Sequence, residues 1–167
     1  MPTQTYTPIA RQVLTSAQAS ITFSSIPSTY TDLVLVATGG TVASGQAIYA
    51  QFNGDTATNY SDTVLIGNGS TASSTRATLN GVRVLGRFVG TDGTLNANGI
   101  THIMNYANTT TFKTVVNRSN NSNGTSASVS LWRATPAAIN SITLIGDGPS
   151  NILANTTFTL YGIKAGS

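Results

Sequence analysis

Short runs of β-branched and aromatic residues recur along the whole chain, and clusters of Gly, Asn, Ser and Asp separate one run from the next. This rhythm is typical of β-sandwiches and β-barrels, in which short strands alternate with turns. No segment keeps the period of about 3.6 residues that marks an amphipathic helix. Composition does not shift along the chain and no internal repeat of fixed period is visible, so the sequence predicts one all-β domain.

About ten strands are expected in this domain. Residues 1–12, which are rich in Thr and Pro, are expected to form an extended N-terminal arm, and residues 13–167 the β domain itself. The stretches 68–74 and 119–126 have the Gly, Asn and Ser content of loops. The predicted strands are 21–26, 32–39, 47–52, 62–67, 81–89, 100–107, 112–118, 127–133, 141–146 and 157–163.

The chain is poor in ionisable side chains. Charged residues make up 8% of it, against roughly 25% in an ordinary globular protein. It has no Glu, no Cys and one His, whereas Thr, Ser, Asn and Gly together make up nearly half of the residues. The surface is therefore expected to consist of hydroxyl and amide groups. Such groups can be buried against a neighbouring protein at a lower desolvation cost than ions, and they respond little to salt.

The same composition excludes several classes of function. The absence of Cys excludes disulfides and thiolate metal sites. The basic residues are scattered from Arg11 to Lys164, whereas nucleic-acid binding requires a clustered basic patch, so no nucleic-acid partner is expected. No apolar run approaches the ~20 residues that span a bilayer, and no secretory signal is visible. Neither a membrane partner nor secretion is expected, and synthesis in a cytoplasm is predicted.

One segment in the first half of the chain concentrates Asp, Asn and Gly. Asn53, Asp55, Asn59 and Asp62 offer oxygen ligands, but their spacing misses the EF-hand pattern and no Glu is present to bind calcium bidentately. The order Asn53, Gly54, Asp55 fits a turn, because Asn and Gly tolerate positive φ and Asx side chains bond to nearby backbone. The segment is therefore interpreted as turn chemistry, and no metal or cofactor is expected.

The single histidine, His102, lies in a predicted strand, where alternation places it on one face with Ile100, Met104 and Tyr106. No acid that could orient the imidazole as a base is close in sequence, and the chain has neither a G-x-S-x-G motif nor a Ser-Lys motif. His102 is therefore interpreted as a packed or interface residue, and no catalytic residue is expected.

Arg and Trp side chains supply the other candidates. Arg83 and Arg87 share one face of a predicted strand, and Trp132 precedes Arg133 in another. Three interpretations stay open for these residues. They form either an amphipathic strand face on which an Arg stacks, or an oligomer interface, where Arg and Trp are favoured. A sugar-stacking platform is a third possibility, although only one Trp is present to build it.

Five segments of the chain carry a resemblance to known proteins. They are SITFSSIPSTYTDLVLV from Ser20, FNGDTATNYSDT from Phe52, IMNYANTTTFKTVVNR from Ile103, LWRATPAAINSITL from Leu131 and TTFTLYGIKA from Thr156. In this order they resemble a widespread group of virion proteins of tailed bacteriophages and prophages, over almost the whole length of the chain. The resemblance implies a jelly-roll-like antiparallel β-sandwich and a structural, non-enzymatic role, with no catalytic residue to carry over.

Within that group, a single charge-poor domain favours a capsid decoration (cement) protein, which binds the mature shell between capsomers, on the surface of the virion, and stabilises it. The expected partners are the major capsid protein and further copies of the chain, as a homotrimer by analogy with other cement proteins. The interface candidates are Thr3, Tyr6 and Arg11 in the arm, with Arg83, Arg87, His102, Trp132 and Arg133 in the β domain.

Two rival functions remain at this stage. A tail-associated protein, either structural or an adhesin that binds a host glycan, is distinguished by a few copies at the tail tip in place of hundreds over the head. A hydrolase that acts on envelope sugars usually needs paired carboxylates about 5 to 10 Å apart. Asp55 and Asp62 are the only near pair in the sequence, so this second rival is disfavoured.

Overall fold

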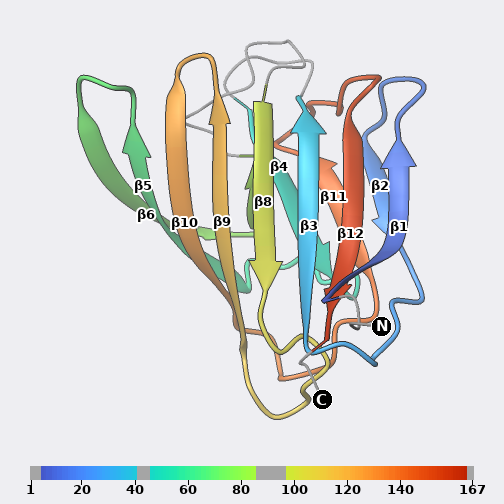
Figure 1. Cartoon of the computed structure of the whole chain (residues 1–167). Coiled ribbons are helices and arrows are strands. Elements are labelled where there is room, and N and C mark those ends of the chain that lie inside the picture. The colour runs from blue at the N-terminus through green and yellow to red at the C-terminus, as the bar shows by residue number, and fades with distance from the viewer. Residues whose placement is uncertain (1–4, 41–45, 86–96, 165–167) are drawn as a thin grey trace.

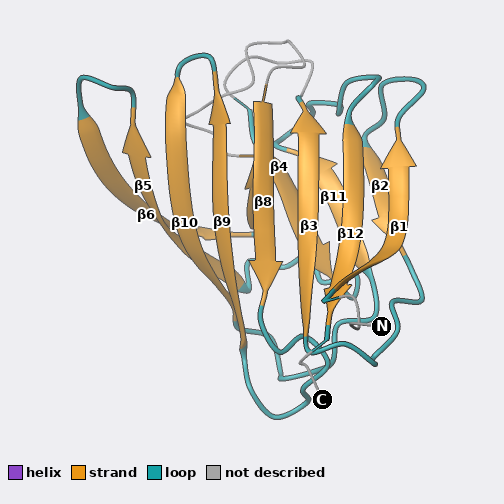
Figure 2. Ribbon diagram, in the orientation of Figure 1, coloured by secondary structure: helices purple, strands orange, loops and turns teal. Residues whose placement is uncertain are grey.

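The structure is a computed structural model that describes residues 5–40, 46–85 and 97–164. The described residues form twelve strands and no helix, so none of them lies in a helix that could cross a membrane. The strands build two antiparallel sheets, one of eight strands and one of four, which pack face to face (Figure 1, Figure 2). The predicted all-β sandwich is therefore confirmed.

The edges of the larger sheet are β1 and β6, which lie at opposite sides of Figure 1. In spatial order the large sheet contains β1 (Tyr6–Val13), β12 (Thr157–Ile163), β3 (Asp32–Gly39), β8 (Ala97–Ile103), β9 (Lys113–Asn121), β10 (Gly124–Trp132), β5 (Tyr60–Gly67) and β6 (Ala72–Leu79). The small sheet contains β2 (Ser20–Phe23), β11 (Ile142–Gly146), β4 (Ile48–Phe52) and β7 (Val82–Leu85).

Eight of these strands follow a jelly-roll path. The strands β1, β12, β3 and β8 are neighbours in the large sheet, and β2, β11, β4 and β7 form the small sheet in the corresponding order. Successive strands of this set lie in opposite sheets, except β4 and β7, which are neighbours in the small sheet. The first and last strands of the set, β1 and β12, run antiparallel to each other, as do β2 and β11, as a rolled-up double strand requires. Two hairpins, β5–β6 and β9–β10, are inserted into the path and widen the large sheet beyond β8.

Strand alternation decides which side chains fill the space between the sheets. Every second residue of β9 and β10 is buried, whereas β3, paired on both sides, buries residues of both faces. The centre of the core contains Leu35, Phe52, Ile142 and Phe158, all fully buried. Burial of large apolar side chains of this kind stabilises the fold by roughly 1.5–3 kcal/mol for each residue.

The inner face of the inserted hairpin β9–β10 is polar where the jelly roll is apolar. The Asn117 amide donates to Val84 O (2.9 Å) and to Thr101 Oγ1 (2.8 Å), so it connects β9 to β7 and β8. The hydroxyls of Ser119 and Ser126 are 3.0 Å apart across the hairpin. These hydrogen bonds compensate for the burial of polar groups, which would otherwise destabilise the added strands.

Each of the ten predicted strands overlaps an observed one, but the structure adds two strands that were not expected. Residues 1–12 were expected to form a free arm, whereas Tyr6–Val13 is the edge strand β1, paired with β12 over its length. Pro8 is tolerated because it lies on an edge strand, beside a register shift between Pro8 and Ala10. The other addition is β6, which begins inside the stretch 68–74 that was interpreted as a loop.

The boundaries of two other segments also differ from the prediction. The stretch 119–126, expected to be a loop, belongs mostly to β9 and β10, which approach each other closely enough to leave only a short turn. The strand predicted at 100–107 begins earlier and ends at Ile103. Residues 86–89 of the strand predicted at 81–89 lie outside the described residues.

Candidate functional site on the outer face of the large sheet

The outer face of the large sheet, which is turned away from the small sheet, carries most of the exposed large apolar side chains of the described chain. Leu65 is 60% exposed, Val129 54% and Val116 42%. Val116 on β9 pairs with Val129 on β10, and Leu65 on β5 pairs with Ala127 on β10. Contiguous exposed apolar surface of this kind is typical of sites that bind another molecule.

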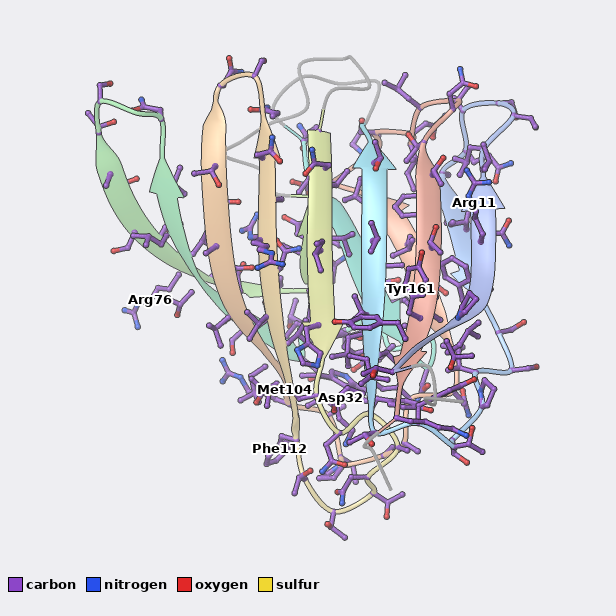
Figure 3. All side chains as sticks on the ribbon, in the orientation of Figure 1. Arg11, Asp32, Arg76, Met104, Phe112 and Tyr161 are labelled. Atoms are coloured by element: carbon purple, nitrogen blue, oxygen red, sulfur yellow. The ribbon has the colours of Figure 1, made fainter. Side chains whose placement is uncertain are left out.

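A shallow groove of about 720 Å³ crosses this face over β3, β8 and β9. One side is closed by Tyr6 and Tyr161, whose rings meet edge to face with centroids 6.3 Å apart. Figure 3 shows Tyr161 on β12, near the edge of the sheet that β1 forms. This is the apolar groove, and its lining consists of Tyr6, Val34, Val36, Ile100, His102, Val116, Asn117, Arg118, Ala127 and Tyr161.

A second hollow, of about 660 Å³, lies beside the first over β10, β5 and β6. It combines hydroxyl groups of Ser61, Thr63 and Thr78 with the two arginines Arg76 and Arg133, and is named the hydroxyl groove. The Arg133 Nε donates to Ser61 Oγ over 3.1 Å. Arg133 is exposed, so this predicted interface candidate does lie on the surface.

His102 lies at the end of the apolar groove and is paired with an acid that sequence reasoning did not associate with it. The His102 Nε2 and Asp32 Oδ2 are 2.9 Å apart, and the other Asp32 oxygen accepts the Asn105 N–H at 2.6 Å. The pair forms because β3 and β8 are neighbours in the sheet. No hydroxyl within the described residues is bonded to the imidazole, so the two side chains do not form a Ser-His-Asp arrangement.

The face predicted for His102 is only partly correct. Ile100 lies on the same outer face, but β8 ends before Met104, and Tyr106 is fully buried in the core. The Tyr106 hydroxyl donates to Pro27 O, and burial raises the pKa of Tyr106. Met104 is exposed and lies near Asp32 at the end of the sheet (Figure 3).

Arg83 was proposed as an interface residue, and the structure corrects this. Arg83 is 3% exposed and lies between the sheets, where its Nε donates to Asp62 Oδ2. Its guanidinium also lies 5.6 Å from the centre of the Tyr49 ring. A buried cation needs such a partner, so Arg83 holds β7 against β5 and is unavailable to another molecule. Arg87, expected on the same face, lies outside the described residues.

Trp132 is likewise a core residue, 4% exposed. Its ring is stacked near Tyr60 and meets Phe52 edge to face, with centroids 6.3 Å and 5.5 Å away. The indole N–H donates to Asp55 Oδ2 over 2.7 Å. Both the interface role and the sugar-stacking platform proposed for Trp132 are therefore wrong, because neither the ring face nor the N–H is accessible to a ligand.

Of the three candidates in the predicted arm, two are described. Tyr6 and Arg11 are exposed residues of β1 and lie on the outer face, where Tyr6 borders the apolar groove. Thr3 lies outside the described residues.

The Asn- and Asp-rich segment is a turn, as predicted. Asn53 and Gly54 both have positive φ, 53° and 73°. Asp55 Oδ1 accepts the Ala57 N–H at 3.0 Å, and the Asn59 amide donates to both carboxylate oxygens of Asp55. Asp62 lies elsewhere, paired with Arg83, so the four oxygen-bearing side chains do not converge. No group of three His, Cys, Asp or Glu side chains that could hold a metal ion occurs within the described ranges.

Asp55 gives the fold a predictable response to acid. Burial alone would raise the pKa of Asp55, but the hydrogen bonds from Trp132, Asn59 and Ala57 outweigh it and lower the pKa from the ordinary value of 3.8. As the pH falls, the Asp55 carboxylate is therefore protonated in the unfolded chain before it is protonated in the folded chain. The contribution of Asp55 to the free energy of unfolding, which is present above about pH 4, is lost below that pH. The difference in unfolding free energy between wild type and Asp55→Asn, measured by urea titration, is expected to stay constant from pH 7 to 5 and to shrink below pH 4. An unchanged difference down to pH 2.5 would contradict it.

Lys113 is a buried cation that stabilises a loop. It is 1% exposed, and its Nζ donates to the carbonyl oxygens of Asn108 and Thr111, both at 2.7 Å. Burial lowers the pKa of Lys113. The two carbonyls stabilise the ammonium, so Lys113 fixes the connection between β8 and β9 and does not add charge to the outer face.

Sequence reasoning missed Arg76 and Arg118 as candidates. Both are exposed and lie on the outer face, because Arg76 pairs with Thr63 across β5–β6 and Arg118 pairs with Ala127 across β9–β10. Residue parity within the predicted strand 112–118 indicated that Arg118 shares a face with Val116. No such signal existed for Arg76, because its strand was not recognised.

Comparison with known proteins gives only distant likenesses. No family model and no curated protein sequence matches the chain. A lactose- and MES-liganded congerin II is 16% identical and has a TM-score of 0.39, covering 84% of this chain and 98% of its own. A galectin from Caenorhabditis elegans is 10% identical with a TM-score of 0.36, over 89% and 94% of the two chains. A protein of unknown function from Shewanella oneidensis is 14% identical with a TM-score of 0.34, over 100% and 79%. Scores this low support no conclusion about function, and the jelly-roll assignment rests on the strand order.

Proposed function

We propose that the chain is a bacteriophage virion structural protein, a capsid decoration protein that binds the mature shell between capsomers and stabilises it, without catalytic activity. The observation that carries this proposal is the exposed apolar surface of Leu65, Ile100, Val116 and Val129 on a chain otherwise poor in charge. This surface loses contact with water when a second protein covers it, which favours association. The sequence resemblance to phage virion proteins supports the same function.

Stabilisation of the shell follows from mass action. A protein that binds the assembled shell and not its separated subunits stabilises the shell by about 2.7 kcal/mol per site at a free concentration of 100 times Kd. A homotrimer seated on a symmetric position adds effective concentration on the order of millimolar, so weak individual contacts suffice. Trimer formation and the major capsid protein as partner are parts of this proposal.

The test is to locate the protein on the particle and to disrupt its proposed binding surface by substitution. Cryo-electron microscopy of the intact particle is expected to show the chain in many copies over the head. Purified shells that lack the chain should bind the wild-type protein and become more resistant to heat. Val129→Asp places a charge in the proposed contact and should weaken binding by at least about tenfold. Thr22→Asp, a change at an exposed position on the small sheet, is the matched control and should bind normally.

A tail-associated adhesin that binds a host glycan is the alternative function. The observation that favours it is the pair Tyr6 and Tyr161 at the edge of the apolar groove, because accessible aromatic rings can pack against sugars. A few copies at the tail tip, with none over the head, would reject the decoration protein and favour the adhesin. A glycan array would then test sugar binding by wild type and by Tyr161→Ala.

A further inference from the structure

The charges of the outer face are strongly asymmetric. Four exposed arginines, Arg11, Arg76, Arg118 and Arg133, lie on it, and Figure 3 shows Arg11 and Arg76 at opposite edges of the sheet. Asp32 is the single acid that the described residues contribute to this face, and His102 already contacts it. Four arginines that are far apart in the sequence therefore lie on one face of the folded chain.

The other described aspartates are engaged away from this face. Asp55 accepts hydrogen bonds from Trp132, Asp62 is buried against Arg83, and Asp147 accepts from the Tyr49 hydroxyl at 3.4 Å. They therefore leave the positive charge of the outer face without local compensation.

Arg118 lies at the centre of this arrangement. It borders the apolar groove and two smaller hollows, one of about 160 Å³ beside Asn120 and one of about 260 Å³ beside Leu65. Its direct neighbours across the sheet are Ile100 on β8 and Ala127 on β10. Arg118 has no hydrogen-bond or ion-pair partner within the described part of the chain. The unpaired guanidinium thus has apolar residues as its direct neighbours across the sheet, and polar side chains line the smallest of the three hollows.

This combination selects a carboxylate as the ligand group. A guanidinium presents five N–H donors in a planar fork that matches the two oxygens of a carboxylate. The bond is stronger when apolar neighbours are covered by the same ligand and water is excluded. An acid side chain flanked by apolar side chains satisfies both requirements, because its neighbours can enter the apolar groove and the hollow beside Leu65, both of which Arg118 borders.

A second copy of the chain does not fit this face through its own outer face. Two outer faces brought together would oppose the four arginines of each copy with a single aspartate from the other, and like charges disfavour such a contact. Nucleic acid fits poorly as well, because the arginines stand apart between Val, Ile and Leu side chains and form no continuous basic track of the kind that follows a phosphate backbone.

We propose that the outer face binds an acidic, extended segment of a different protein, in which Asp or Glu alternates with apolar residues and one carboxylate pairs with Arg118. The apolar side chains of the segment occupy the apolar groove, and further acids approach Arg76 and Arg133. This inference rests on the proposed function, because it specifies the chemistry that the shell protein presents. It also reverses the expectation that binding is insensitive to salt.

The probe is an acetylated and amidated heptapeptide in which valine and glutamate alternate, with a glutamine-for-glutamate peptide as its neutral counterpart. Binding to the purified full chain is measured by isothermal titration calorimetry. The glutamate peptide is expected to bind at least about tenfold more tightly than the glutamine peptide, and Arg118→Gln should remove most of that difference. Arg118→Lys should restore it only in part, because an ammonium lacks the planar fork. Affinity should fall as salt rises from 50 to 200 mM.

Arg11→Gln is the matched control, since Arg11 is also exposed, unpaired in the described structure and on the outer face, but borders neither groove. It should bind the peptide as wild type does. Equal peptide affinity of Arg118→Gln and wild type, or an equal loss with Arg11→Gln, overturns the inference. Tighter binding of a single-stranded oligothymidine than of the peptide overturns it in favour of nucleic acid. A chain that binds the peptide but is absent from the head refutes only the proposed function, and one that decorates the head without binding the peptide refutes only this inference.

Discussion

Replacing Asp62 by asparagine is expected to lower the free energy of unfolding by about 3–5 kcal/mol. Asp62 is 4% exposed and Arg83 3%, so the substitution removes a carboxylate that accepts from a guanidinium buried between the sheets. The Tyr49 hydroxyl, 3.4 Å from Arg83 Nη1, compensates for little of that loss because it carries no charge. Urea denaturation followed by tryptophan fluorescence measures the change, and an unaltered m-value would show that the unfolded state is the same.

Two further variants separate the buried charge from a general loss of contacts. Replacing both partners, as Asp62→Leu with Arg83→Met, removes the charges together and is expected to recover most of the stability, because apolar side chains of similar volume often replace a buried pair without loss. Asp32→Asn removes an acid from the partly exposed pair with His102, and its cost should stay near 1 kcal/mol or below. A loss below about 1 kcal/mol for Asp62→Asn would show that the Arg83 site is hydrated and would contradict this account.

The strands that sequence reasoning identified are those whose own residues carry the signal. In β3 and β10, β-branched and aromatic side chains alternate or cluster in the way that buried strands require. By contrast, β6 has the sequence ASSTRATL, which contains no apolar run, and it is a strand because its whole length pairs with β5. The same holds for β1, whose partner β12 lies at the other end of the chain. Pairing between distant segments is a tertiary property that local propensity does not encode.

The site could be predicted even less well than the fold, for the same physical reason. Arg83 and Trp132 are residue types that favour interfaces, but their burial depends on where the small sheet covers the large one. The contact between His102 and Asp32 depends on the register of β3 with β8. Strand alternation alone indicates that Arg118 shares a face with Val116. The hollows that make Arg118 a candidate binding residue are formed together with neighbouring strands, whose positions the sequence does not give.

Trp132→Ala is expected to destabilise the fold by about 3–5 kcal/mol, the range found when a large buried aromatic side chain is removed. The indole fills the space between Phe52 and Tyr60, with ring centroids 5.5 Å and 6.3 Å away, so its loss leaves a cavity between the sheets. It also removes the N–H donor to Asp55, which lies in the turn between β4 and β5. Thermal unfolding monitored by far-ultraviolet circular dichroism measures the loss.

Trp132→Phe distinguishes the ring from the N–H. Phenylalanine keeps much of the packing but donates no hydrogen bond, so a smaller loss of stability, about 1–2 kcal/mol, is expected. The variant should also lose less stability than wild type below pH 4, because Asp55 then lacks one of the hydrogen bonds that lower its pKa. Trp132→Phe should still bind shells at a temperature where it is folded, since Trp132 does not reach the outer face. A folded Trp132→Phe variant that fails to bind shells would contradict the placement of the binding surface, because it would mean that a residue between the sheets takes part in the contact.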